Sequence, residues 1–172
     1  MRRFLLSCAM LAVLAVTAAA GAGASTSARP GFLVVRKAVG DGGVKGSPVV
    51  TVVVRGGFVL GRVTQEAQVD VYHLGSASAP QVAGADVSTA SVRWHGLPGK
   101  QYSGSNFRFR ATGGFYRVVV RGSGVYVFAG GRGSVWLQGS SVNRNQDGSY
   151  SVDGRRFRSM PTRVLKRQIG GG

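Results

Sequence analysis

The chain has 172 residues, of which 22 are lysine or arginine and 6 are aspartate or glutamate, so its formal net charge is +16. A surplus of this size favours association with polyanions such as nucleic acid, anionic glycans or an anionic cell envelope, and it carries no information about the fold. The one cysteine is Cys8, in a segment that we expect to be removed, which excludes disulfides, thiolate nucleophiles and cysteine-ligated metals from the rest of the chain.

The first 24 residues are typical of an export signal. Met1-Arg2-Arg3 is basic, the next residues are apolar and rich in alanine, and Ala22-Gly23-Ala24 has the small side chains that signal peptidase requires. We therefore expect residues 1–24 to be a signal peptide and residues 25–172 to be a single domain, secreted or held in the cell envelope. A retained signal anchor is the alternative, because residues 4–24 carry no charge and are long enough to span a bilayer.

No segment after residue 24 has helical periodicity. Apolar residues alternate or form short runs, and glycines interrupt them at regular intervals, which predicts an antiparallel all-β sandwich or barrel. In chain order we expect strands at 32–36, 49–55, 58–63, 67–73, 87–94, 106–110, 115–121, 125–129, 134–138, 149–152 and 155–158. Turns are expected at Asp41-Gly42, Leu97-Pro98-Gly99, Asp147-Gly148 and Asp153-Gly154.

The pentapeptide Val-Val-Val-Arg-Gly occurs at residues 52–56 and again at residues 118–122. The same offset, without a gap, aligns Val59 with Val125 and Val69 with Val135. We interpret this as an internally duplicated three-strand meander in which each Arg-Gly marks a turn. Valines on both faces of each copy indicate central strands.

The sequence predicts no catalytic residues, no metal ligands and no cofactor. Three of the six acids precede glycine and are expected to cap turns, while Glu66 and Asp70 show no sign of a paired glycosidase site. His73 and His95 are the only histidines, and no Gly-x-Ser-x-Gly nucleophile motif accompanies them.

Two aromatic residues are candidates for ligand binding. Trp94 and Tyr102 lie near predicted strand ends, and aromatic side chains beside arginine often hold sugars or bases in β domains. Trp136 and Phe107 are instead expected to fill the core.

Basic residues concentrate near the C-terminus. If the outward faces of the strands meet, this stretch joins two arginines of the 106–110 strand in one patch suited to phosphate or sulfate groups. The predicted polyanion-binding residues are Arg108, Arg110, Arg155, Arg156, Arg158, Arg163, Lys166 and Arg167. A solvated charged face, or protection of edge strands against aggregation, explains the same residues.

These patterns favour a non-enzymatic structural or interaction module of the cell envelope, with a basic face for an anionic polymer or glycan. We expect no sequence-specific nucleic acid partner and no membrane span once the signal is removed. Two alternatives stay open: an extracellular hydrolase of glycan or peptide, and a carrier of a small apolar ligand inside a closed β-barrel.

Overall fold

The computed structural model describes residues 29–38, 48–75, 77–140 and 148–171, and all regular secondary structure in these residues is β-strand. The expected signal peptide, the turn at Asp41-Gly42 and Asp147 lie outside the described residues. No helix long and apolar enough to cross a membrane occurs in the part of the chain that the structure describes.

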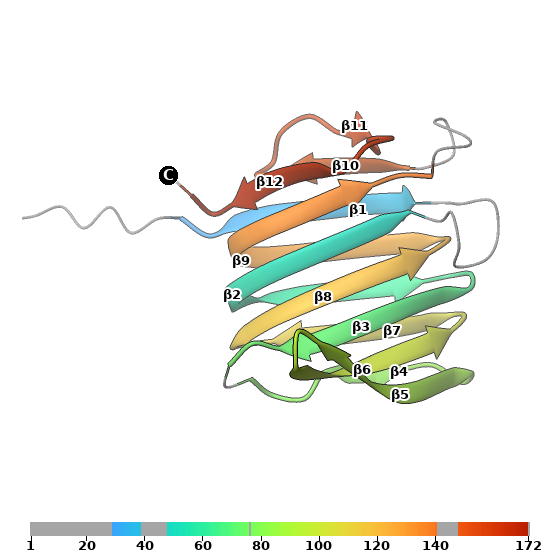
Figure 1. Cartoon of the computed structure of the whole chain (residues 1–172). Helices are drawn as coiled ribbons and strands as arrows, with labels where there is room; N and C mark the ends of the chain where they lie inside the picture. The colour runs from blue at the N-terminus through green and yellow to red at the C-terminus, as the bar shows by residue number, and fades with distance from the viewer. Residues whose placement is uncertain (1–28, 39–47, 76, 141–147, 172) are drawn as a thin grey trace, which may run out of the picture.

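Twelve antiparallel strands form one hydrogen-bonded sheet within the described residues (Figure 1). In chain order they are β1 (Gly31–Ala38), β2 (Val49–Val63), β3 (Ala67–His73), β4 (Gln81–Ala83), β5 (Val87–Trp94), β6 (Leu97–Gly104), β7 (Phe107–Thr112), β8 (Phe115–Gly122), β9 (Val125–Gln138), β10 (Ser149–Val152), β11 (Arg158–Ser159) and β12 (Leu165–Ile169). The all-β, antiparallel prediction is therefore confirmed.

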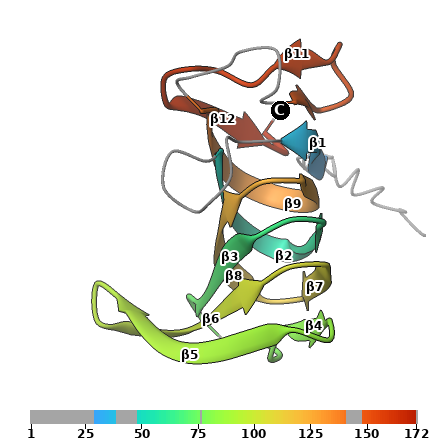
Figure 2. The same ribbon diagram turned by 90° about the vertical axis from the view of Figure 1, so that its right-hand side faces the viewer.

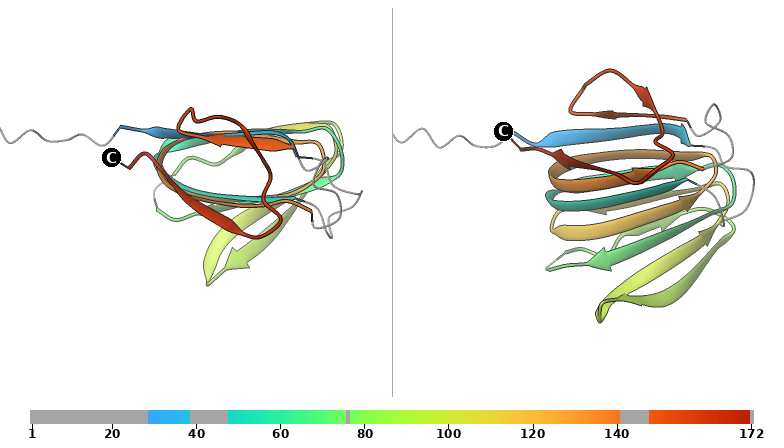
Figure 3. Two further views of the ribbon diagram at one scale, coloured as in Figure 1. Left: turned by 90° about the horizontal axis from the view of Figure 1, so that it is seen from above. Right: turned by 45° about the horizontal axis from the view of Figure 1, so that its top comes forward.

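The sheet folds over on itself into two layers that face each other (Figures 2 and 3). The front layer, nearest the reader in Figure 1, has the order β12, second half of β9, first half of β2, β8, β3, β6, β5. The back layer has the order β11, β10, β1, first half of β9, second half of β2, β7, β4. Strands β2 and β9 therefore belong to both layers.

Pairs of glycines lie side by side where the chain bends between the back layer and the front layer. These pairs are Gly56-Gly57 in β2, Gly113-Gly114 between β7 and β8, and Gly130-Gly131 in β9. The Gly56 N–H donates to the carbonyl of Gly114 at 2.7 Å, so adjacent bends are hydrogen-bonded. A Cβ atom on Gly57 would lie 1.8 Å from the carbonyl oxygen of Gly130. Only glycine allows the backbones to approach this closely.

These bends correct two strand predictions. Residues 49–55 and 58–63 were expected to form two strands, and so were 125–129 and 134–138, but they are the halves of β2 and β9. The glycine pairs change the direction of the backbone while its hydrogen bonding to the neighbouring strand continues, with a register shift in β2 between Arg55 and Phe58.

The two copies of the pentapeptide are neighbours in the front layer. Val52 of β2 pairs directly with Val118 of β8, and both side chains are fully buried between the layers. Their prediction as central strands is confirmed. The prediction that each Arg-Gly marks a turn is wrong for the first copy, because β2 continues through Gly56, whereas the chain turns after Gly122. In the first copy the bend at Gly56-Gly57 comes before the turn that leads to β3, whereas in the second copy the turn after Gly122 comes before the bend at Gly130-Gly131. The arrangement of the strands therefore does not make the duplication evident.

The predicted turn at Leu97-Pro98-Gly99 is also wrong, since these residues begin β6. The turn is formed by His95 and Gly96, which have φ angles of 47° and 80°, as a tight two-residue hairpin requires. Pro98 is tolerated in the strand because it pairs only with Arg93 of β5, so no second neighbour needs its missing N–H.

The last hairpin differs from the prediction, and three strands of the sheet were not expected. Asp153 and Gly154 form the expected turn with φ angles of 53° and 71°, but the returning strand is only Arg158–Ser159 rather than 155–158. Strands β4, β6 and β12 were not predicted. The polar residues Lys166, Arg167 and Gln168 follow one another at the centre of β12, so apolar and polar residues do not alternate there. Strand β4 pairs only with β7.

Substitution Gly57→Ala tests the close approach of the glycine pairs. We expect the free energy of unfolding to fall by about 2–3 kcal/mol, because the new Cβ would meet the backbone of Gly130 and Gly131 rather than the end of a flexible side chain. Gly75→Ala is the matched control: its Cβ would meet no atom nearer than 3.8 Å, and we expect a change within about 0.5 kcal/mol. Urea unfolding of both variants measures the difference, and equal stabilities would contradict this account of the bends.

Candidate functional site

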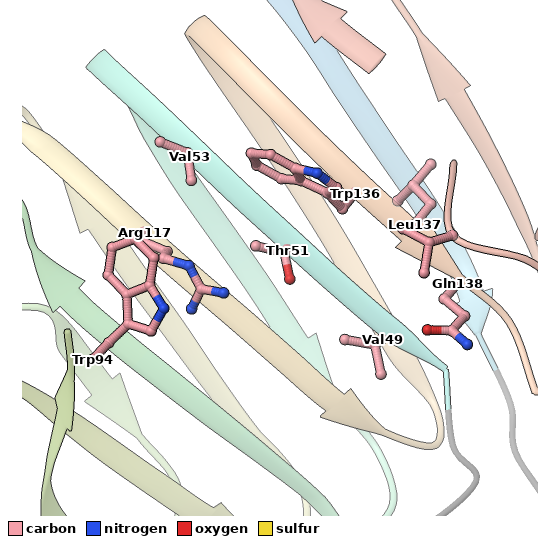
Figure 4. Close-up of a pocket in the computed structure, with 9 residues that line it drawn as sticks. Val49, Thr51, Val53, Trp94, Arg117, Trp136, Leu137 and Gln138 are labelled. Carbon is pink, nitrogen blue, oxygen red and sulfur yellow. The ribbon is translucent and has the colours of Figure 1, made fainter. Parts of the chain in front are cut away.

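A groove of about 420 Å³ crosses the outward face of the front layer (Figure 4). Its floor is formed by β2 and β8, and its ends by β5 and by β9 with the segment before β12. The lining residues are Val49, Thr51, Val53, Trp94, Arg117, Trp136, Leu137, Gln138 and Val164. The β5–β6 hairpin projects from the front layer, so the groove lies in a recess rather than on a flat sheet (Figure 2).

Trp94 closes one end of the groove together with Arg117. The Arg117 guanidinium carbon lies 4.4 Å from the centre of the Trp94 ring and 5.6 Å from that of Tyr72. Burial lowers the pKa of Arg117, and burial followed by the charge of Asp70 raises the pKa of Tyr72. A half-buried cation is thus held against two aromatic rings, with its guanidinium directed toward Thr51 (Figure 4).

Trp136 lies at the other end of the groove. It pairs across strands with Lys166 of β12, whose ammonium nitrogen is 5.3 Å from the centre of the indole ring. The prediction that Trp136 fills the core is wrong. Val135 and Leu137 point inward, so strand alternation turns Trp136 outward. The same prediction for Phe107 is confirmed, since its side chain is fully buried.

A polar network anchors the front layer beside the groove. Asp70 is only 3% exposed, and its Oδ2 accepts a hydrogen bond from the Arg121 guanidinium at 2.6 Å. Its Oδ1 accepts from the side-chain amides of Gln68 and Gln101 at 2.9 and 3.1 Å. Asp70 pairs directly with Val119, which is buried on the same face. The carboxylate is therefore fully engaged in holding β3, β6 and β8 together.

The second predicted aromatic site residue lies elsewhere. Tyr102 pairs across strands with Val69, whose side chain is in the core, and Tyr102 packs against that core rather than beside Trp94. Burial raises the pKa of its phenol.

The predicted polyanion-binding residues are divided among separate places. Arg155, Arg156, Arg158 and Arg167 surround one hollow of about 190 Å³ at the β10–β12 end of the molecule. Lys166 lies beside Trp136 at one end of the groove, and Arg163 is exposed just before β12. Arg108 and Arg110 lie on the outward face of the back layer, separated from β10 by β1, β9 and β2. The single patch that the sequence predicted does not form.

The histidines do not meet a carboxylate in the groove. His73 packs edge-on against Tyr116, at 5.4 Å between ring centres, and alternation puts it on the opposite face of β3 from Asp70. His95 lies in the hairpin turn against Trp94. Among the described residues no cluster of three or more His, Cys, Asp or Glu could hold a metal ion.

One hollow that the sequence analysis did not anticipate brings two acids together. It measures about 530 Å³, lies beside the start of β5, and is lined by Glu66 and Asp86 with Ser88 and Ser103. No local pattern indicates this hollow, because the two acids are brought together only by the pairing of β5 with β6 and of β6 with β3.

Comparisons with models of protein families, with curated proteins and with solved structures found no match.

Substitution Asp70→Asn tests the network beside the groove. An asparagine keeps one acceptor oxygen but turns an amide toward Arg121, so we expect the free energy of unfolding to fall by about 1.5–3 kcal/mol. Asp86→Asn removes the same charge from an exposed position and should leave stability nearly unchanged. Denaturant unfolding compares them, and equal effects would show that Asp70 acts only through net charge.

Two buried tyrosines, Tyr72 and Tyr116, and the partly buried Tyr102 predict loss of stability in alkali. Burial raises the pKa of Tyr72, Tyr102 and Tyr116 above the ordinary 10.0. Their contribution to stability is complete below pH 10 and is lost as the pH rises through the folded-state pKa values, because the unfolded chain releases these protons first. Denaturant unfolding from about pH 9 to 12 should therefore decline less steeply for Tyr102→Phe than for the wild type.

The matched control is Tyr126→Phe, whose ring is 38% exposed. Its decline should parallel that of the wild type. A Tyr102→Phe variant that declined as steeply as the wild type would show that burial of this phenol does not contribute.

Proposed function

We propose that this protein is a non-enzymatic, exported binding module whose front groove holds an anionic glycan. The observation that carries the proposal is the pairing of each of its two tryptophans with a cation at opposite ends of one groove, Trp94 with Arg117 and Trp136 with Lys166.

The chemistry of the groove fits a chain of sugar rings with acidic substituents. Indole faces accept the apolar C–H face of a sugar ring, while a guanidinium or ammonium beside them binds a carboxylate, phosphate or sulfate group. Thr51 and Gln138 add a hydroxyl and an amide on the lining for neutral hydroxyl groups. The formal charge of +16 adds long-range attraction to such a polymer.

Binding rather than catalysis is supported by the side chains that line the groove. They include neither a carboxylate nor an imidazole, and Thr51 is the one hydroxyl among them. A hydrolytic mechanism needs an acid and a base, or a nucleophile activated by a base, within reach of the same substrate bond. The apolar-carrier alternative is supported less well, because valines and phenylalanines pack as one core between the layers.

Titration with an acidic oligosaccharide and its neutral counterpart tests the proposal. We expect Trp94→Ala and Trp136→Ala each to weaken binding of both ligands by about tenfold, through loss of one ring platform of about 1–3 kcal/mol. Arg117→Gln should weaken only the acidic ligand. Arg93→Gln removes one charge from an exposed site on β5 and serves as the control, with unchanged affinity expected.

Three results would contradict the proposal. One is equal affinity of the wild type for the acidic and neutral ligands, and another is unchanged binding by both tryptophan variants. The third is cleavage of the oligosaccharide that is lost in Glu66→Gln or Asp86→Asn, which would place a hydrolase at the acidic hollow instead.

A further inference from the structure

The outward face of the back layer carries a continuous aromatic patch, on the opposite side of the molecule from the groove. Phe32 of β1, Phe58 of β2 and Phe128 of β9 form its centre. Phe32 and Phe128 lie 5.9 Å apart with nearly parallel rings, and Phe58 lies 5.1 Å from Phe128. Phe32 is 41% exposed and Phe128 40%, and Tyr126 extends the patch along β9. The exposed large apolar residues of the described chain are Phe32, Tyr126, Phe128, Phe157 and Val164. Phe32, Tyr126 and Phe128 belong to this patch.

Arginines border the patch on the same face. Arg36, Arg62, Arg108 and Arg110 are all exposed and alternate outward on β1, β2 and β7. The cross-strand rows run from Phe128 through Leu60 to Arg110, and from Tyr126 through Arg62 to Arg108. Apolar and basic side chains therefore follow one another across three neighbouring strands.

One pair in these rows is unfavourable for the isolated protein. Arg62 and Arg108 lie directly opposite each other on β2 and β7, and like charges in that position destabilise an antiparallel sheet. A hollow of about 330 Å³ lies next to them, lined by Leu60, Gln81, Arg108 and Arg110 among others. An anion bound there would relieve the repulsion and accept hydrogen bonds from the guanidinium groups.

None of the acids in the described residues is an outward residue of β1, β9, β2 or β7, the four strands that carry the patch and its arginines. Asp153 lies at the edge of the patch, where its carboxylate accepts a hydrogen bond from the backbone N–H of Phe32. A second copy of the chain would bring the same arginines to this surface, so the charges favour an anionic partner.

We propose that this face docks on an anionic phospholipid surface, with the rings in the interfacial region and a lipid phosphate at Arg108 and Arg110. The rings pack against one another and form a continuous apolar surface, which suits the boundary between headgroups and acyl chains better than separate stacking platforms for bases or sugars. Arginines at the rim of such a surface meet the phosphates.

Co-sedimentation of the exported protein with vesicles tests this proposal. We expect binding to vesicles that contain phosphatidylglycerol and little binding to phosphatidylcholine alone. The double variant Arg62→Gln with Arg108→Gln should bind about thirtyfold more weakly, since each basic side chain at an anionic membrane contributes about fivefold. The control, Arg93→Gln with Lys100→Gln, removes two exposed charges from β5 and β6 and should bind as the wild type does. Phe128→Ser should also weaken binding, by about tenfold or more.

Tryptophan quenching separates this proposal from glycan binding in the groove. Both tryptophans of the chain lie on the front layer, so an aqueous quencher should reach them equally well with and without vesicles. Trp94→Ala should lose glycan binding and keep vesicle binding. Protection of the tryptophans by vesicles, equal binding to both kinds of vesicle, or wild-type binding by the Arg62/Arg108 variant would each overturn the proposal. So would retention only of an anionic polymer, with no lipid binding.

Discussion

Close contact between backbones at one edge of the molecule is the constraint on which the rest of the structure depends. Gly57 lies against Gly130, and the N–H of Gly56 donates a hydrogen bond to the carbonyl of Gly114. At this place β2, β9 and the connection between β7 and β8 pass together from one layer to the other. Any side chain in this contact would separate the strands. Since β2 and β9 contribute to both layers, these bends determine which side chains share the core and which share an outer face.

The bends also explain how one sheet presents two chemically different faces. On the front layer, Trp94 and Trp136 stand apart at the ends of a recess, each beside a cation. On the back layer, phenylalanines lie in contact with one another, with arginines at their border. A protein that binds a polymer on one face and a lipid surface on the other would connect the two, which is consistent with the proposed place in the cell envelope.

The sequence predicted the all-β class, most strands, and the central position of the valine runs, because strand alternation and glycine spacing are local signals. It did not predict that Gly56-Gly57 bends a continuous strand, since a glycine pair is equally typical of a turn. Trp94 was predicted as a site residue from its place near a strand end. Trp136 was missed because its outward direction depends on the register beyond the bend in β9, and the division of the basic residues depends on strand order, which no local pattern contains.

The most direct test of the central claim, that both tryptophans contact one ligand, is nuclear magnetic resonance of the two indole N–H groups during titration with an acidic oligosaccharide. The chain has only two tryptophans, so each signal reports one end of the groove. We predict that both indole signals shift with the same dissociation constant, while the backbone signals of Phe32 and Phe128 stay in place. Binding that leaves either indole signal unmoved would contradict the account.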